Sequence, residues 1–187
     1  LVRSWLNQRQ MLAVQRHRET VPEPFAAEID LEAHRKAADY TTALGRLARW
    51  DNLLDAAIAL FLTLGGGINA IDALWSSAGW AQPWHGTAVV LSTMLLMAAL
   101  SLPLSLYRTF GIESRFGFNR TSVGLFIVDL LKGLAVGLVL GVPLVAIVLW
   151  LMEQAGSWWW IYAWLVWVAF TVFVTWAWPA FIAPLFN

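Results

Sequence analysis

The chain has 187 residues, of which 59% are apolar and only 13% are charged, and its formal net charge is zero. Soluble domains usually carry about 25% charged residues, so the composition argues against a soluble protein and favours one that lies in a membrane. The chain has no cysteine, which excludes a disulfide framework and a thiolate metal site.

The amino-terminal part, residues 1–52, reads as a cytoplasmic helical segment that follows a first span missing from this chain. Residues 1–20 have the polar, arginine-rich character of the end of a preceding helix. Pro22 and Pro24 then interrupt helix, because proline lacks a backbone donor and restricts the residue before it. From 26 to 50 the apolar residues return at helical spacing. We expect a helix that covers the membrane or another domain; the alternative is a docking element for a partner.

Four apolar runs follow the amino-terminal segment. A helix needs roughly 20 apolar residues to cross a hydrocarbon core of about 30 Å, and each run is about that long or longer. The runs lie at residues 53–75, 87–107, 122–152 and 157–179. The sequence therefore predicts an all-α, polytopic membrane domain over residues 53–187, with four spanning helices.

The basic residues predict the orientation of these helices. All twelve Lys and Arg side chains lie before the first run, within residues 108–121, or just beyond at Lys132. The other two connections, residues 76–86 and 153–156, contain none. Since basic residues of short loops are retained in the cytoplasm, we expect three cytoplasmic segments. They are residues 1–52, 108–121 and 180–187.

Tryptophans stand at both ends of the last apolar run, as expected for indole rings in the two headgroup regions. Between the ends, Trp160, Trp164 and Trp167 form a stripe at helical spacing. We interpret the stripe as lipid contact or helix packing, the alternative being an aromatic wall for a substrate.

One pair of opposite charges lies inside the third run. Asp129 and Lys132 are three residues apart, so they can face one another on a helix. A charge near the bilayer centre costs on the order of 2.5 to 3.5 kcal/mol, which makes such a pair a candidate functional site. The run is longer than a span requires, so the pair could instead lie near the interface, where Lys132 reaches water. The two readings are an interfacial pair and part of a polar chamber wall.

Catalytic signatures are absent from the sequence. The three histidines, His17, His34 and His85, are never four residues apart, so no His-Glu-x-x-His zinc motif is present. The glycine-rich residues 63–68 lack the lysine and the spacing of a phosphate-binding loop. No nucleic-acid partner is expected. From residue chemistry alone, the chain is a helical membrane module, and a nonenzymatic scaffold or permeation module remains an alternative function.

Three blocks of sequence resemble the amino-terminal membrane region of the type I CAAX prenyl proteases, which are integral-membrane zinc metallopeptidases. The blocks are residues 102–119 (LPLSLYRTFGIESRFGFN), 161–164 (IYAW) and 181–187 (FIAPLFN). Arg9 and the basic residues that follow it are similar to the first cytoplasmic loop of that family. The resemblance runs from about residue 9 to residue 187.

The resemblance implies a larger seven-helix protein around a water-filled chamber, with zinc on its cytoplasmic side. Family members cleave prenylated or other peptides, using a His-Glu-x-x-His helix and a later glutamate; zinc activates water and the motif glutamate acts as base. Those ligands follow the matched region. We therefore assign no catalytic or metal-binding residue here, and expect the zinc protease domain outside the chain and the chain alone to be inactive. The implied partners are the lipid bilayer, a peptide or prenylated peptide, and that carboxy-terminal domain.

The resemblance also gives a role to the polar connection, which we define as residues 108–121. Its side chains Arg108, Glu113, Arg115 and Asn119 form either a solvated loop or the rim of the chamber mouth. In the second reading Glu113 and Asn119 brace the zinc domain by hydrogen bonds and do not touch zinc.

Overall fold

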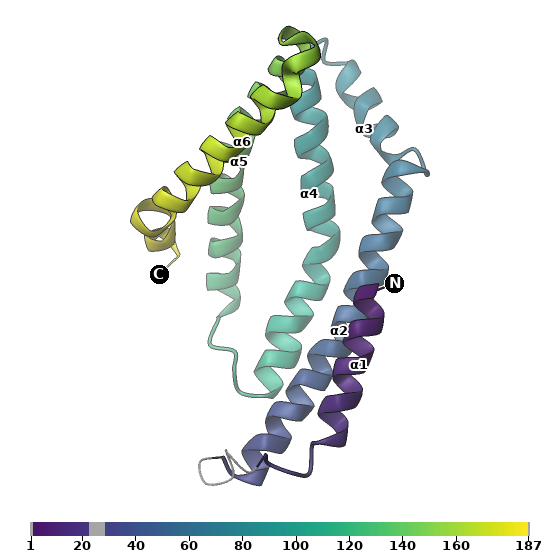
Figure 1. Ribbon diagram of the computed structural model, residues 1–187, viewed down its shortest axis with the longest axis vertical. Coiled ribbons are helices and arrows are strands. Elements are labelled where there is room, and N and C mark those ends of the chain that lie inside the picture. The colour runs from purple at the N-terminus through teal and green to yellow at the C-terminus, as the bar shows by residue number, and fades with distance from the viewer. Residues whose placement is uncertain (1, 23–28, 187) are drawn as a thin grey trace. The chain divides into compact units, whose positions relative to one another are not determined.

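The computed structural model describes residues 2–22 and 29–186, and within them every regular element is helical. Figure 1 shows the helices in chain order. The longer ones are α1 (Val2–Arg16), α2 (Leu31–Thr63), α3 (Gly67–Ser76), α4 (Trp84–Leu106), α5 (Val123–Gln154) and α6 (Trp159–Ala177). The shorter ones are the π-helices η2 (Tyr107–Glu113) and η4 (Trp178–Ile182) and the 3₁₀-helices η3 (Gly156–Trp158) and η5 (Ala183–Leu185). The prediction of an all-α fold is confirmed.

Two long helices begin where short polar side chains cap them. The Asp30 carboxylate accepts a hydrogen bond of 2.6 Å from the backbone N–H of Ala33, at the start of α2. The Ser122 hydroxyl oxygen accepts one of 3.2 Å from the N–H of Leu125, at the start of α5. Each cap satisfies a donor that the first helical turn leaves unpaired. The expected start near residue 26 falls among residues 23–28, which lie outside the described residues.

The chain forms two compact units, and each is described by itself. The first contains residues 1–65 and 97–120, and the second contains residues 66–96 and 121–187. Helix α4 therefore contributes its first part to the second unit and its last part to the first.

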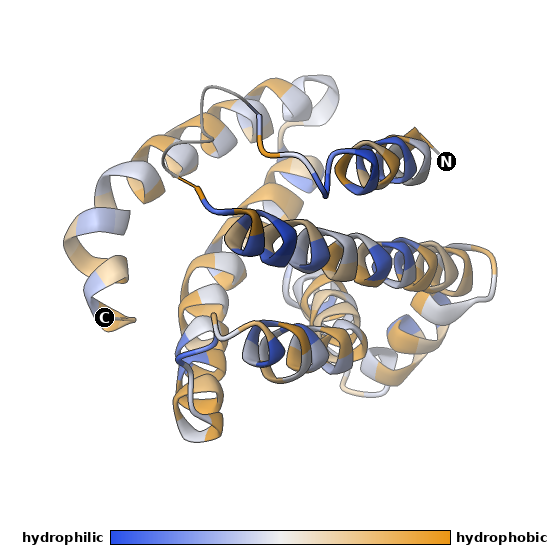
Figure 2. Cartoon of the chain, turned by 90° about the horizontal axis from the view of Figure 1, so that it is seen from below, coloured by the Kyte–Doolittle hydropathy of each residue, from blue (hydrophilic) through white to orange (hydrophobic). Residues whose placement is uncertain are grey.

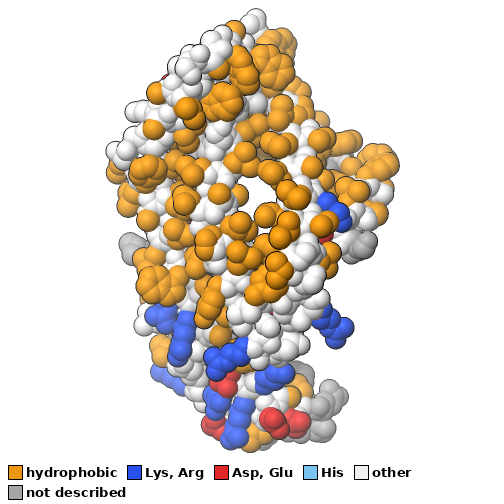
Figure 3. All heavy atoms as spheres, turned by 180° about the vertical axis from the view of Figure 1, so that it is seen from behind, with side chains coloured by type: hydrophobic (Ala, Val, Ile, Leu, Met, Phe, Trp, Pro, Cys, Tyr) orange, Lys and Arg blue, Asp and Glu red, His pale blue; other side chains and the backbone are white. Residues whose placement is uncertain are grey.

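The first unit is built on the packing of α1 along α2. Met11 is buried against α2, and the Asn7 amide donates a hydrogen bond of 2.8 Å to the carbonyl of Gly45. Figure 2 shows α2 changing along its length from mostly hydrophilic to mostly hydrophobic residues. Figure 3 shows Lys and Arg side chains gathered in one part of the face that it draws. This division along α2 fits a helix that passes from water into a membrane.

The second unit is built mainly on the pair α5 and α6, which contact one another. Helix α3 joins α4 through the Trp75 indole, which donates a hydrogen bond of 2.9 Å to Ser92. Large apolar side chains of α5 and α6 remain exposed, with 72% of Val139 and 64% of Val172 accessible. Soluble proteins rarely expose continuous apolar surfaces of this kind, so these helices face lipid or further protein.

Among the described residues, three helical stretches are long and apolar enough to cross a membrane: Trp84–Glu113, Val123–Gln154 and Gly156–Leu185. The number is four if the bent pair α2 and α3 forms one broken span, the alternative for this pair being a re-entrant loop. The chain is thus a multi-pass membrane protein. The run expected as one helix over residues 53–75 is interrupted at Leu64–Gly66, where Gly66 adopts a φ of 77° that residues with a Cβ disfavour.

Candidate functional site

The first half of the polar connection is helical and continues α4 without a break. Its π-helix η2 has i to i+5 spacing, and Arg108 and Glu113 are five residues apart, one turn from each other. The guanidinium Nε of Arg108 donates to Oε1 of Glu113 over 3.1 Å. The backbone carbonyl of Glu113 accepts from the N–H groups of Phe118 (2.8 Å) and Asn119 (3.1 Å). Glu113 therefore fixes both the end of the helix and the turn after it.

Aromatic contacts attach this turn to α2. The ring of Tyr40 lies 5.5 Å from that of Phe116 and 4.8 Å from that of Phe118, both edge to face. Such pairs contribute about 0.5–1.5 kcal/mol each. Ile112 of η2 is also buried. Apolar packing, and not ion pairing, is thus the main attachment of the polar connection to the first unit.

The ion pair of the polar connection is partly open to water. The side chain of Arg108 is 57% exposed and that of Glu113 is 24% exposed. Pairs of this kind contribute about 0–1 kcal/mol, so the pair orients the two side chains more than it stabilises the fold. Arg115 is exposed, with its guanidinium carbon 5.9 Å from the centre of the Phe116 ring.

The same unit has a cavity of about 480 Å³ between α2 and the end of α4, which we call the basic cavity. Two arginines and three aromatic side chains form much of its wall: Arg46, Arg115, Trp50, Tyr107 and Phe116. Arg115 was a candidate from the sequence, whereas Arg46 was not. Arg46 and Arg115 are 69 positions apart in the chain, so no local sequence pattern indicates that they line one cavity.

Asp129 and Lys132 lie in the second unit, near the start of α5. Lys132 Nζ is 3.7 Å from Asp129 Oδ1 and donates a hydrogen bond of 2.6 Å to the carbonyl oxygen of Leu185. Asp129 Oδ1 is itself buried and accepts no hydrogen bond from the residues that the structure describes. The ammonium group is therefore shared between a carboxylate and the end of the last helical turn.

Sequence reasoning missed an ion-pair cluster between α1 and α2, formed by Arg18, Glu19, Arg35 and Asp39. Arg18 binds Asp39 with two nitrogens, Nε to Oδ1 and Nη2 to Oδ2, each over 2.8 Å. Glu19 accepts from Arg18 and Arg35. The hydrogen bond from Arg18 lowers the pKa of Asp39, and that from Arg35 is the largest cause of the lowered pKa of Glu19. The charged forms of both carboxylates are therefore favoured.

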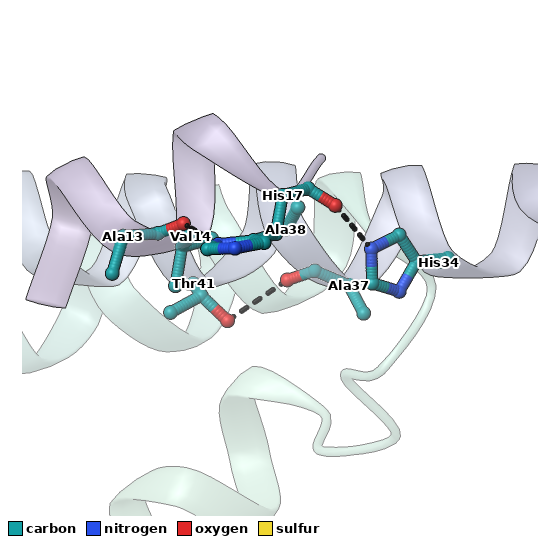
Figure 4. Close-up of a pocket in the computed structure, with 7 residues that line it drawn as sticks. All are labelled: Ala13, Val14, His17, His34, Ala37, Ala38 and Thr41. Carbon is teal, nitrogen blue, oxygen red and sulfur yellow. Dashed lines mark hydrogen bonds between the residues drawn. The ribbon is translucent and has the colours of Figure 1, made fainter. Parts of the chain in front are cut away.

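A shallow cavity of about 380 Å³ lies beside this cluster and is lined by His17 and His34 (Figure 4). A ring nitrogen of His34 lies 2.8 Å from the backbone oxygen of His17, and the Thr41 hydroxyl donates to the carbonyl of Ala37 over 2.8 Å. The His34 imidazole thus contacts the end of the segment that follows α1, whereas a ring nitrogen of His17 lies 2.8 Å from the backbone oxygen of Ala13 in α1 itself.

The described residues of this chain do not provide a binding site for the zinc that the resemblance implies. Throughout residues 2–22 and 29–186, no three His, Cys, Asp or Glu side chains lie close enough to hold a metal ion. His85, for example, lies 2.7 Å from Asp72, with no third ligand beside them.

The predicted site residues fall into two groups. The structure places Arg108, Glu113, Arg115 and Asn119 in η2 and the segment directly after it in the first unit, and places Asp129 and Lys132 together in the second. The tryptophan stripe of α6 is exposed, with 60% of Trp164 accessible.

Comparison with known proteins supports a single family. A family model described as "CAAX prenyl protease N-terminal, five membrane helices" matches residues 10–187. A protein from Caenorhabditis elegans named CAAX prenyl protease 1 homolog is 30% identical, over 91% of this chain and 38% of its own length. The Arabidopsis thaliana protein of the same name is 34% identical, over 72% of this chain and 32% of its own.

The crystal structure of S. mikatae Ste24p has a similar fold, with a TM-score of 0.84 and 24% sequence identity. The similarity covers 98% of this chain and 44% of that one. The chain therefore spans less than half the length of each of these proteins.

Proposed function

Since this chain belongs to the CAAX prenyl protease family, we propose that it is the membrane part of an integral-membrane metalloendopeptidase whose peptide-cleaving residues lie outside these 187 residues. The observation that carries the proposal is the match of the family's amino-terminal membrane region to residues 10–187. The fold, which is similar to that of Ste24p over nearly the whole chain, agrees with it.

The proposed substrates are peptides, with or without a prenyl group, that are cut near the cytoplasmic face of the membrane. The relatives are named as prenyl proteases, which supports this class of substrate. The positions of the basic residues support the cytoplasmic face, because they place the polar connection on that side.

We assign the polar connection a supporting role at the mouth of the chamber. Glu113 holds Arg108 through its side chain and the turn at Asn119 through its backbone, so it gives the mouth a fixed shape. Arg115 adds an exposed positive charge beside this turn. In this account the four side chains position the cleaving domain or the entering peptide, and none of them takes part in the reaction.

Asp129 and Lys132 are proposed to form part of the polar chamber wall. The partly buried carboxylate and the ammonium group near it are a costly arrangement in an apolar helix, which membrane proteins usually keep beside water or another polar surface. The hydrogen bond from Lys132 to Leu185 extends this polar region to the last described turn.

Peptide cleavage by the full-length protein tests the proposal. Purified in detergent, it should cleave a farnesylated peptide that ends in a CAAX sequence, lose this activity on treatment with a zinc chelator, and regain it when zinc is added. Metal analysis should find zinc in the active preparation. Absence of cleavage and of zinc from a folded full-length preparation would favour the scaffold or permeation alternative.

A further inference from the structure

Of the four side chains assigned to the chamber mouth, only Arg115 lines the basic cavity, so this cavity is a separate candidate site. It lies wholly in the first unit, between α2 and η2, and Leu47 and Ile112 are buried beside it. Its wall combines apolar side chains with the guanidinium groups of Arg46 and Arg115. A cavity with this lining suits a ligand that has an anionic group attached to an apolar body.

The position of the basic cavity along the chain places it at the edge of the membrane. Its lining comes from residues 43–50, just before the apolar run that begins at residue 53, and from residues 107–116, where the run in α4 ends. Trp50 is 66% exposed and Tyr107 is 60% exposed. Amphipathic rings of this kind favour the headgroup region of the membrane. One such ring on each side of the cavity therefore indicates that the cavity lies at the depth of the headgroups.

Two acidic side chains of the same unit, Asp39 and Glu113, are paired with other arginines. Asp39 is bound by Arg18 and Glu113 by Arg108. Among the residues with described positions, no carboxylate oxygen lies within 4.0 Å of Arg46 or Arg115. Two guanidinium groups thus line one cavity without a described carboxylate at ion-pair distance, although the charge of Arg115 also helps to lower the pKa of Asp39.

We propose that the basic cavity binds the headgroup of an anionic phospholipid from the cytoplasmic leaflet. The phosphate group pairs with Arg46 and Arg115, because planar guanidinium groups bind phosphate with two parallel hydrogen bonds. The glycerol and upper acyl chains contact Trp50 and Tyr107. Basic pockets between membrane helices on the cytoplasmic side are suited to such headgroups, and the aromatic rings at this depth favour a lipid over a soluble anion or an acidic peptide.

Lipid retention by the full-length protein tests the proposal. The protein is purified in a neutral detergent, titrated with phosphatidylglycerol or phosphatidylcholine, and examined by native mass spectrometry. One phosphatidylglycerol should be retained in preference to phosphatidylcholine. A basic side chain near an anionic surface contributes about 1 kcal/mol, which is about fivefold in affinity, so R46Q/R115Q should weaken retention about 30-fold.

The matched control is R49Q/R120Q, which removes two exposed arginines of the same unit that do not line the cavity. It should change retention less than threefold. Equal loss in both pairs, equal retention of the two lipids, or equally strong competition by soluble glycerol phosphate would overturn the proposal. An effect of R46Q/R115Q on peptide cleavage without any effect on lipid retention would point to an acidic peptide as the ligand, which also overturns it.

A second measurement needs no variant, so it holds even if R46Q/R115Q fails to fold. A phosphatidylglycerol analogue with a photoreactive group near its headgroup should crosslink to residues 43–50 and 107–116 of the wild-type protein. Crosslinks found only elsewhere would contradict the assignment. Neither experiment depends on peptide cleavage, so this proposal and the protease function can fail separately.

Discussion

Lys132 Nζ donates a hydrogen bond of 2.6 Å to the carbonyl oxygen of Leu185, which lies 53 positions later in the chain. The same nitrogen is 3.7 Å from Asp129 Oδ1. This oxygen is buried and accepts no hydrogen bond from the described residues. One ammonium group therefore fixes the last turn of the chain to the start of α5 and balances a carboxylate in an apolar helix.

Substituting Lys132 by methionine should loosen this last turn. The change leaves the Leu185 carbonyl unpaired and the Asp129 charge without its counter-ion, at a cost of about 1–3 kcal/mol. Hydrogen exchange over residues 178–186 should become faster. The double variant D129N/K132M should recover part of the protection, because it removes the unbalanced charge. Unchanged exchange in K132M would show that the hydrogen bond does not hold the turn.

The ion-pair cluster predicts a loss of stability in acid. Asp39 and Glu19 have a pKa below their ordinary values of 3.8 and 4.5, chiefly through hydrogen bonds from Arg18 and Arg35 respectively. A carboxyl group with a lowered folded-state pKa stabilises the fold above its unfolded pKa, and this contribution is lost as the pH falls through the folded pKa. The contacts between α1 and α2 should therefore weaken below about pH 4.

Thermal unfolding of the full-length protein between pH 6 and pH 3 measures this effect. R18Q should lower the unfolding temperature at pH 6 and flatten its dependence on pH. R16Q is the control, because no described carboxylate lies within 4.0 Å of Arg16. Parallel pH curves for wild type and R18Q would rule out a contribution from the cluster.

Hydropathy predicted the positions of the later helices closely. The expected runs at 122–152 and 157–179 correspond to α5 (Val123–Gln154) and α6 (Trp159–Ala177), because long, mostly apolar runs form helices whatever their neighbours are. Hydropathy does not detect the break at Leu64–Gly66, since leucine and glycine add no charge. The signal available was the glycine triplet at residues 65–67, which favours a positive φ over regular helix.

The site was predictable only where its contacts are local. The spacing of Asp129 and Lys132 along a helix was enough to suggest their approach. The contacts of Tyr40 with Phe116 and Phe118, and the shared cavity of Arg46 and Arg115, join residues more than 60 positions apart. Periodicity carries no information on such contacts, because they depend on how the helices pack.

Gly45 permits the close approach of α1 to α2, and an alanine there should disturb it. An added Cβ would lie 2.7 Å from Met11 Cγ and 3.2 Å from Asn7 Oδ1. Overpacking costs about 1–3 kcal/mol, against a gain of about 1 kcal/mol in helix propensity. G45A should therefore lower the free energy of unfolding by about 1 kcal/mol.

A double-mutant cycle separates this clash from other effects of the substitution. M11A alone removes a buried side chain and should also destabilise the protein. M11A/G45A should be more stable than the sum of the single changes predicts, because the atoms that clash are gone. Strict additivity would mean that Met11 moves aside without cost.

The supporting role of the polar connection predicts a modest loss of activity in E113A and N119A of the full-length protein. Loss of the Glu113 carboxylate frees Arg108, and a partly exposed ion pair of this kind contributes about 0.2–1 kcal/mol, or up to about fivefold in rate. Peptide cleavage and thermal unfolding should be measured together, with S114A as control because Ser114 is exposed beside Glu113. Wild-type values of activity and stability for both E113A and N119A would end this interpretation.

The central claim is that the chain belongs to a protease that cuts peptides at the face of the membrane where the polar connection lies. In a full-length protein kept free of other reactive cysteines, R120C marks that face, because this chain has no cysteine of its own. Vesicles are sorted by whether a membrane-impermeant reagent labels R120C, and an impermeant CAAX peptide is added outside. Cleavage should occur only in vesicles whose R120C is labelled. Cleavage only in unlabelled vesicles, or in neither kind, would contradict the account.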